Sequence, residues 1–266
     1  MLARSVHPWV SRVVRLGYVA KGIIYSLIGV LAMRVGFGLR GGRITDPGGV
    51  LMQLLQQPFG LVVLAVIGFG IMGYTAYYLV EAIADLRGKG GGWRGWIDRS
   101  LTIIKSVFYG LIGVQALRIV FLGRRPNGDP EDQARMVMRF PLGSILLVLI
   151  GIGIAIYGIT QIKMAWEGGV DEDIDVARVR REARWILPFG RAGAFARGVI
   201  LVLMGWALAS SGWRQDPYDA DGYREVLIAI ASINPWLLAA MGAGLLSFGL
   251  YQLCHARYAK LAVKSE

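Results

Sequence analysis

A basic residue inside a hydrophobic segment recurs three times along this chain. The segments are AKGIIYSLIGVLA (20–32), IKSVFYGLIGVQA (104–116) and ARGVILVLMGWAL (196–208), and they carry Lys21, Lys105 and Arg197 at the second position. Tyr25 and Tyr109 follow the two lysines by four residues, and a glycine follows every base by eight. A charge inside an apolar span costs free energy. Its recurrence therefore predicts an internal repeat and an equivalent environment for the three bases.

Hydropathy predicts that this chain crosses a membrane six times. The 266 residues are 55% hydrophobic and 18% charged, and the mean hydropathy is +0.51. A helix needs about 20 apolar residues to cross a bilayer. Six runs have this length, near residues 16–36, 58–80, 101–122, 140–163, 192–210 and 235–255. We therefore expect an all-α, polytopic membrane protein.

The six spans pair into three repeats of two helices. The even-numbered spans align at two positions. The first position holds an aromatic residue in every repeat, Tyr74, Tyr157 and Phe248. The second, one turn further on, holds Tyr78, Gln161 and Gln252. We interpret the first set as bundle packing or an interfacial aromatic belt, and the glutamines as bridges between helices. The predicted repeats cover residues 1–90, 91–172 and 173–266. An even number of spans separates them, so we expect parallel repeats with pseudo-threefold symmetry about the membrane normal.

The connections inside the repeats are also similar to one another. They read DPGGVLMQLLQQPFG (46–60), DPEDQARMVMRFPLG (129–143) and DADGYREVLIAIASINPW (219–236). Each has an aspartate, a short amphipathic stretch and a proline before the next span. Aspartate is a good helix N-cap, and proline suits the first helical turn. We expect a short interfacial helix in each connection.

Three segments carry a resemblance to a known family. RLGYVAKGIIYSLIGVLA, DPGGVLMQLLQQPFG and FGLYQLCHARY resemble a bacterial membrane-protein family catalogued as domain of unknown function 1206. The resemblance covers nearly the whole chain as three tandem two-helix units. It implies a six-helix bacterial inner-membrane protein and supplies no activity. The middle repeat departs from the pattern, because Ser106 stands where the first repeat has Gly22 and the ending Arg257–Tyr258 has no counterpart.

The distribution of positive charge predicts the orientation. Six spans define two sides of the membrane, and both termini lie on the same side. That side holds 19 Lys and Arg, and the opposite side holds 10. Positive residues favour the cytoplasm, so we expect cytoplasmic termini. Lys21, Lys105 and Arg197 then lie at the cytoplasmic ends of their spans. We interpret the polar segment 167–191 as a short cytoplasmic helix on the membrane, or else a solvated linker.

Two interpretations of the three bases stay open. Long basic side chains can snorkel to the headgroups, and this suits Lys21 and Arg34, which lie 13 residues apart in one span. Alternatively, the three bases face inward as a ring that binds an anionic lipid headgroup or a small anion. Tyr25 and Tyr109 lie one turn deeper on the same helix faces as their lysines and could share that site.

The sequence contains no recognisable catalytic constellation. His7 and His255 are the two histidines, and the single cysteine, Cys254, excludes an internal disulfide and a cysteine-based metal cluster. Glu81 and Asp85 end the second span, and no acidic residue is expected deep inside a span. No Walker loop, HExxH or GxSxG motif occurs. We predict no catalytic residue, no cofactor and no metal site.

These observations favour a non-enzymatic membrane module. We expect it to bind a lipid, an anionic or hydrophobic ligand, or a partner membrane protein as a subunit or scaffold. Nucleic acid is not an expected partner, because the orientation bias and anionic headgroups account for the net charge of +11. The alternative is a channel or transporter along the pseudo-threefold axis. Few polar residues are expected at the bundle centre, which favours binding over conduction: Ser26, Thr75, Gln115, Thr160 and Ser247.

Overall fold

The computed structural model describes residues 4–5, 8–86, 88, 92–123, 130–167, 176–182, 184–220, 222–259 and 262–263. Six helices in this part of the chain are long and apolar enough to cross a membrane. They are α1 (Pro8–Gly36), α3 (Gly60–Ile83), α4 (Trp93–Leu122), α6 (Gly143–Trp166), α8 (Ile186–Arg214) and α10 (Pro235–Tyr258). The predicted fold class, an all-α protein with six spans, is confirmed.

The first helix of each repeat begins earlier than hydropathy predicted. We expected starts near residues 16, 101 and 192, whereas α1, α4 and α8 begin at Pro8, Trp93 and Ile186. The added turns carry polar side chains that lower the hydropathy without ending the helix. Arg99, for example, lies in such a turn and donates hydrogen bonds to the carbonyl oxygens of Ala82 and Ile83 at 2.6 and 2.8 Å.

Each repeat contains a short helix between its two long ones. These are α2 (Pro47–Leu55), α5 (Pro130–Met138) and α9 (Tyr223–Ile233), as predicted. Asp46 is the N-cap of α2, since its carboxylate accepts from Gly49 N at 2.7 Å. The aspartate cap predicted for α9 is wrong, because Gly222 occupies that position. Asp129, the counterpart before α5, lies outside the described residues.

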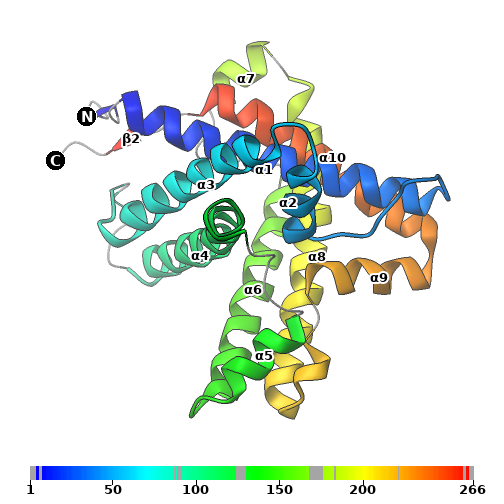
Figure 1. Ribbon diagram of the computed structural model, residues 1–266. Helices are drawn as coiled ribbons and strands as arrows, with labels where there is room; N and C mark the ends of the chain where they lie inside the picture. The colour runs from blue at the N-terminus through cyan, green and yellow to red at the C-terminus, as the bar shows by residue number, and fades with distance from the viewer. Residues whose placement is uncertain are drawn as a thin grey trace.

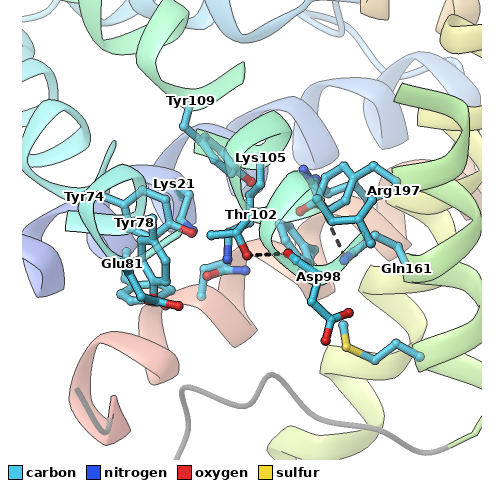
Figure 2. Close-up of a pocket in the computed structure, with 16 residues that line it drawn as sticks. Lys21, Tyr74, Tyr78, Glu81, Asp98, Thr102, Lys105, Tyr109, Gln161 and Arg197 are labelled. Atoms are coloured by element: carbon cyan, nitrogen blue, oxygen red, sulfur yellow. Dashed lines mark hydrogen bonds between the residues drawn. The ribbon is translucent and has the colours of Figure 1, made fainter. Parts of the chain in front are cut away.

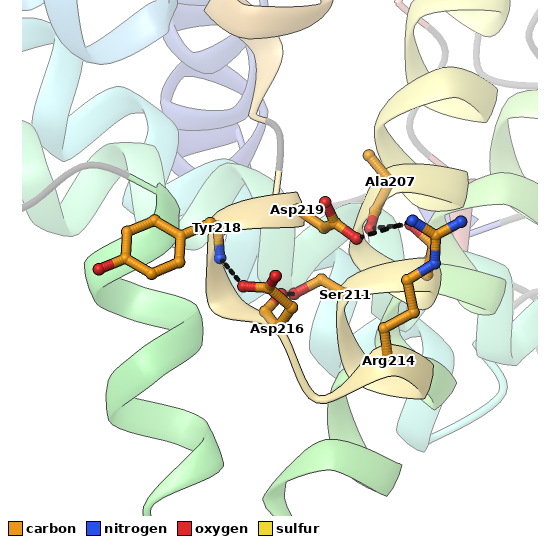
Figure 3. A network of polar contacts seen from close by, with 7 residues as sticks. Ala207, Ser211, Arg214, Asp216, Tyr218 and Asp219 are labelled. Atoms are coloured by element: carbon orange, nitrogen blue, oxygen red, sulfur yellow. Dashed lines mark hydrogen bonds and ion pairs between the residues drawn. The ribbon is translucent and has the colours of Figure 1, made fainter.

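A compact turn joins α8 to the third short helix. Ser211 Oγ donates to the carbonyl oxygen of Asp216 at 2.7 Å, and the Asp216 carboxylate accepts from Tyr218 N at 2.9 Å (Figure 3). Arg214 pairs with Asp219 at 3.1 Å. These contacts cap the short 3-10 helix η1 (Pro217–Asp219) and direct the chain into α9.

Two short strands pair near the two termini of the chain. Strand β1 (Arg4–Ser5) pairs antiparallel with β2 (Ala262–Val263), which holds the two termini together (Figure 1).

The short helix predicted within 167–191 is α7 (Val176–Glu182). Val179 and Ile186 pack against Tyr251 and Tyr258, so α7 lies against the end of α10 (Figure 1).

The six long helices form a closed ring. Around the ring the order is α1, α3, α4, α6, α8 and α10, and α10 contacts α1 again. The most extensive contacts join different repeats, α6 with α8 and α1 with α10. Figure 1 shows these two pairs crossing each other. Within a repeat the contacts are smaller, and α4 touches α6 least of all.

Glycines at one repeated position allow helix backbones to approach across repeats. A Cβ on Gly29 of α1 would lie 2.6 Å from the carbonyl oxygen of Gly242 in α10. A Cβ on Gly205 of α8 would lie at the same distance from the carbonyl oxygen of Gly151 in α6. The third glycine, Gly113, is less crowded, with a methionine sulfur at 3.1 Å. Small residues serve this purpose in membrane helices.

The outer surface of the ring is apolar. Large hydrophobic side chains point outward from the long helices, among them Leu111 of α4 and Leu149 of α6, which are 61% and 60% exposed. Water-soluble proteins rarely expose apolar surface on this scale, whereas lipid chains cover it in a membrane. The ring therefore has the surface of a multi-pass membrane protein.

Candidate functional site

The three repeated bases line one pocket at the centre of the ring. Lys21 comes from α1, Lys105 from α4 and Arg197 from α8, and the pocket has a volume of about 200 Å³ (Figure 2). We call it the axial pocket. Lys21 and Arg197 are 3% and 1% exposed, and Lys105 is partly buried. The snorkelling interpretation is therefore wrong for Lys21 and Arg197, and the binding of an anion stays a prediction.

Equivalent positions of the three repeats build the axial pocket. Besides the bases, the even-numbered spans contribute both of their aligned sets, Tyr74, Tyr157 and Phe248, then Tyr78, Gln161 and Gln252. Our interpretation of the first set as packing or an interfacial belt is incomplete, because these rings line a polar pocket. The same position on each repeat meets at the centre, so the axial pocket lies on the pseudo-threefold axis of the ring.

Lys21 is enclosed by aromatic rings. Its Nζ lies 3.8 Å from the ring centroid of Tyr74, 4.3 Å from that of Tyr18 and 4.5 Å from that of Tyr109. Lys105 Nζ lies 4.2 Å from the centroid of Tyr78. Ring faces attract cations, and the attraction is stronger where water is excluded. The tyrosines therefore offset part of the cost of holding two ammonium groups inside the bundle.

Arg197 is hydrogen-bonded on two of its three nitrogens. Nε donates to the Tyr25 hydroxyl at 3.2 Å, and Nη1 donates to the Tyr157 hydroxyl and to Gln161 Oε1, both at 3.3 Å. The bond to Gln161 bridges α8 and α6, as predicted for this glutamine. The remaining nitrogen, Nη2, is buried and has no hydrogen-bond partner among the described residues. Leaving a buried charged donor unpaired is costly.

The two tyrosines predicted to share the site occupy different places. Tyr109 lines the axial pocket, and its ring lies 4.5 Å from Lys21 Nζ and 5.7 Å from Arg197 Cζ. Tyr25 lies behind Arg197 and holds the guanidinium in position rather than lining the pocket. Four of the five predicted site residues therefore meet in one pocket, and Tyr25 supports it from behind.

The axial pocket also contains two acidic residues that are not among the site residues predicted from the sequence. Glu81 and Asp98 both line it, and Glu81 is only 5% exposed. We expected Glu81 at the water-facing end of a span. Instead, α3 continues to Ile83, so Glu81 is buried inside the ring, whereas Asp98, near the start of α4, lines the pocket but is exposed. The repeat offered a signal, because Glu81 is one turn beyond Tyr78.

The polar residues predicted for the bundle centre are not those that line the axial pocket. None of the five residues expected there belongs to the described lining, which consists mainly of tyrosines, bases and glutamines. His255, in the last turn of α10, is completely buried. Its position in α10 corresponds to that of Glu81 in α3.

The chemistry of the axial pocket suits an oxyanion. Guanidinium, ammonium and phenol groups all donate hydrogen bonds to oxygen, and charged donors do so strongly. Among the described residues, no group of three or more His, Cys, Asp or Glu side chains is placed to hold a metal ion. Figure 2 shows Arg197 and Gln161 facing the pocket from one side, with Lys21, Tyr74 and Tyr78 on the other.

Comparison with known proteins gives similarity along nearly the whole chain. The family described as Domain of Unknown Function (DUF1206) matches residues 16–85, 102–168 and 192–259, one segment in each two-helix repeat. A Bacillus subtilis (strain 168) protein described as "Uncharacterized protein YxxB" is 30% identical over 261 residues, covering 97% of this chain and 94% of that protein. No solved structure matches the chain.

Proposed function

The chain belongs to the family described as Domain of Unknown Function (DUF1206), and we propose that it is a non-enzymatic membrane protein whose axial pocket binds a small oxyanion. The oxyanion is a phosphate or carboxylate group, carried by a lipid headgroup or by a small metabolite. Because the axial pocket combines cations from all three repeats, one bound group would contact the whole ring. We place the protein in a bacterial inner membrane, as the family resemblance implies, with both termini in the cytoplasm, as its charge distribution indicates.

The unpaired nitrogen of Arg197 is the observation that carries this proposal. Nη2 is buried in a pocket-lining residue and has no hydrogen-bond partner among the described residues. A buried guanidinium normally has its donors satisfied, and oxygen atoms of carboxylates and phosphates fit them well. An oxyanion in the axial pocket would supply the missing acceptor.

The charge of the lining supports an anionic ligand. The described lining residues include three formal positive charges, on Lys21, Lys105 and Arg197, and two negative charges, on Glu81 and Asp98. The balance, 3 − 2, leaves one positive charge in excess. An ion pair inside a protein is stable only when its charges are matched and hydrogen-bonded. A ligand with one negative charge would bring the net formal charge of the occupied pocket to zero.

Gln252 narrows the chemistry of the ligand. Its Oε1 is buried, belongs to the pocket lining and has no hydrogen-bond partner among the described residues. This oxygen can accept a hydrogen bond, so a ligand that has a hydroxyl beside its oxyanion would satisfy both Gln252 and Arg197. Inorganic phosphate and glycerol phosphate have this combination of groups.

Transport along the axis is the alternative function, because the axial pocket lies on the pseudo-threefold axis. Deeper in the ring the core is closed by aliphatic side chains that are completely buried, including Ile28, Ile71 and Leu245. A solute could cross only if these side chains separated. The closed core therefore favours binding over conduction.

The proposal is tested by native mass spectrometry on full-length protein purified gently from its own membrane. The variant Arg197→Gln removes the guanidinium with its unpaired Nη2. The control variant, Arg214→Gln, removes an exposed arginine of the same helix that pairs with Asp219. We expect wild type and Arg214→Gln to retain a phosphate-containing molecule, and Arg197→Gln to lose it. Titration with inorganic phosphate and with glycerol phosphate measures the effect, which we expect to be about tenfold to a hundredfold in affinity.

Two outcomes contradict oxyanion binding. One is wild-type protein that neither retains nor binds any of these molecules, and the other is equal binding by Arg197→Gln. Lys105→Gln, at a partly buried position, repeats the test if Arg197→Gln does not fold. A stoichiometric protein partner in the spectrum would indicate a subunit or scaffold instead. Phosphate flux into liposomes containing the wild-type protein would favour the transport alternative.

A further inference from the structure

A second, larger cavity lies between α4, α6 and α8. It has a volume of about 510 Å³, within the range typical of ligand sites. Its body is aliphatic and includes Ile112 of α4, Leu147 and Ile154 of α6, and Met204 of α8. Its described lining shares no residue with that of the axial pocket. We call it the lateral cavity.

The lateral cavity breaks the threefold pattern of the ring. It lies where α4 and α6 make the smallest contact between neighbours in the ring. Ile154 is partly exposed there, whereas its counterparts in the other repeats, Ile71 and Leu245, are completely buried. The first and third repeats fill this position by helix packing, and the second leaves it open.

The opening of the lateral cavity faces the membrane side of the ring. Leu111 of α4 and Ile150 of α6 line it and are also 61% and 41% exposed. They belong to the apolar outer surface that lipid chains would cover. Water gains little in an aliphatic cavity, so hydrocarbon is the natural occupant of one that opens into a bilayer.

One end of the lateral cavity is polar. Tyr223, Arg224 and Glu225 of α9 line it together with Asp46, and Arg224 pairs with Glu225 at 3.3 Å. Tyr223 is 5% exposed, and its buried hydroxyl has no hydrogen-bond partner among the described residues. Burial raises the pKa of this hydroxyl well above its ordinary value, so it remains a hydrogen-bond donor at neutral pH.

We infer that the lateral cavity binds one acyl chain of a membrane lipid, with Tyr223 donating a hydrogen bond to the ester or carboxylate oxygen at the end of the chain. The aliphatic body matches the chain, and the polar end matches the oxygen-bearing group. A phospholipid and a free fatty acid share this chemistry. The inference does not depend on oxyanion binding in the axial pocket, since it uses none of the same residues.

Photocrosslinking in vesicles tests this inference. The full-length protein is reconstituted in phosphatidylglycerol and phosphatidylethanolamine with a phospholipid that carries a diazirine on its acyl chain, and labelled peptides are mapped by mass spectrometry. A parallel sample contains a diazirine fatty acid. We expect saturable labelling of the cavity-lining segments of α4, α6 and α8, in excess of the exposed face of α3. The probe that saturates identifies the source of the chain.

Cavity-filling variants supply the control. Ile154→Trp fills the lateral cavity, whereas Ile156→Trp adds the same side chain at an exposed position of α6 that does not line it. The larger side chain of Ile154→Trp would exclude about two methylene groups of the acyl chain, which lowers the affinity for the chain about tenfold. We therefore expect labelling of the cavity to fall about tenfold in Ile154→Trp and to be unchanged in Ile156→Trp. Met204→Trp fills the lateral cavity from α8 if Ile154→Trp does not fold.

The hydrogen bond from Tyr223 is tested separately. Tyr223→Phe keeps the ring and removes the hydroxyl, so we expect weaker labelling, by about fivefold, with an unchanged midpoint of thermal unfolding. Uniform labelling of every lipid-facing helix would overturn the inference. Cavity labelling that persists in the folded filling variants would also overturn it.

Discussion

The imidazole ring of His255 is stacked on the phenol ring of Tyr18, with the ring centroids 4.1 Å apart and 13° between the planes. Tyr18 shares a 2.6 Å hydrogen bond with Tyr78, and Lys21 Nζ lies 4.3 Å from its ring centroid. The stack therefore connects α10 to α1, and the hydrogen bond connects α1 to α3. These contacts fix one wall of the axial pocket.

Replacing His255 tests whether the stack supports the fold. His255→Ala leaves a cavity in a completely buried site, and we expect the free energy of unfolding to fall by about 2–4 kcal/mol. His255→Phe keeps a flat ring against Tyr18, and we expect a loss of less than about 1.5 kcal/mol. Thermal unfolding in a mild detergent, followed by circular dichroism, measures both. Equal losses would show that stacking is not the stabilising feature.

The repeated glycines should tolerate substitution to different degrees. A Cβ at Gly29 or Gly205 meets a backbone carbonyl at 2.6 Å, and backbone cannot move aside cheaply. We expect Gly29→Ala and Gly205→Ala to cost about 1–3 kcal/mol. Gly113→Ala should cost less, because its neighbour is a flexible side chain. Gly92, with nothing within 4 Å of a Cβ, serves as the control, and a larger effect there than at Gly29 would contradict the packing argument.

The stability of helix α7 should fall at acid pH. Hydrogen bonding from Arg178 lowers the pKa of the Glu182 carboxyl, and the two side chains lie 2.9 Å apart. A lowered pKa in the folded state stabilises the helix above the ordinary pKa, and the stabilisation is lost as pH falls through the lowered value. We expect amide exchange in α7 to be faster in Glu182→Gln than in wild type at neutral pH. The difference should vanish in acid below the folded pKa, and a difference that persists there would exclude the ion pair as its cause.

The orientation in the membrane is tested by fusions to the C-terminus. The positive charge on the side of the termini predicts a cytoplasmic C-terminus. We expect a C-terminal green fluorescent protein to be fluorescent and a C-terminal alkaline phosphatase to be inactive, since each folds on only one side of the inner membrane. The same reporters placed after Arg40 should give the opposite pattern. An active phosphatase at the C-terminus would reverse the assignment.

Much of this fold could be predicted from the sequence, because bilayer thickness sets a minimum length for apolar helices. The six spans and the short helices in the connections followed from local patterns. The starts of α1, α4 and α8 did not, because polar residues such as Arg99 continue a helix after its hydropathy has fallen. A helix end and a hydropathy edge are different physical boundaries.

The candidate site could be predicted only in part. The repeated spacing brought out the three bases, because a charge in a span is rare and therefore informative. Tyr74 and Tyr157 carried no such signal, since aromatic rings suit lipid interfaces and helix packing equally well. Glu81 and Asp98 approach the axis through tertiary packing of α3 against α4. The lateral cavity was not predictable, because the departures of the middle repeat from the common pattern do not by themselves indicate a gap between α4 and α6.

The contacts between repeats exceed those within them, and this bears on how such a chain arose. A two-helix unit of this kind has its most extensive complementary surfaces on its two outer edges, where it meets its neighbours. Such a unit has the properties of a protomer, and three separate copies would close the same ring as a homotrimer. Joining the copies into one chain frees each to diverge. Divergence of the middle copy then accounts for a ring that keeps a shared centre while one side has opened toward the lipid.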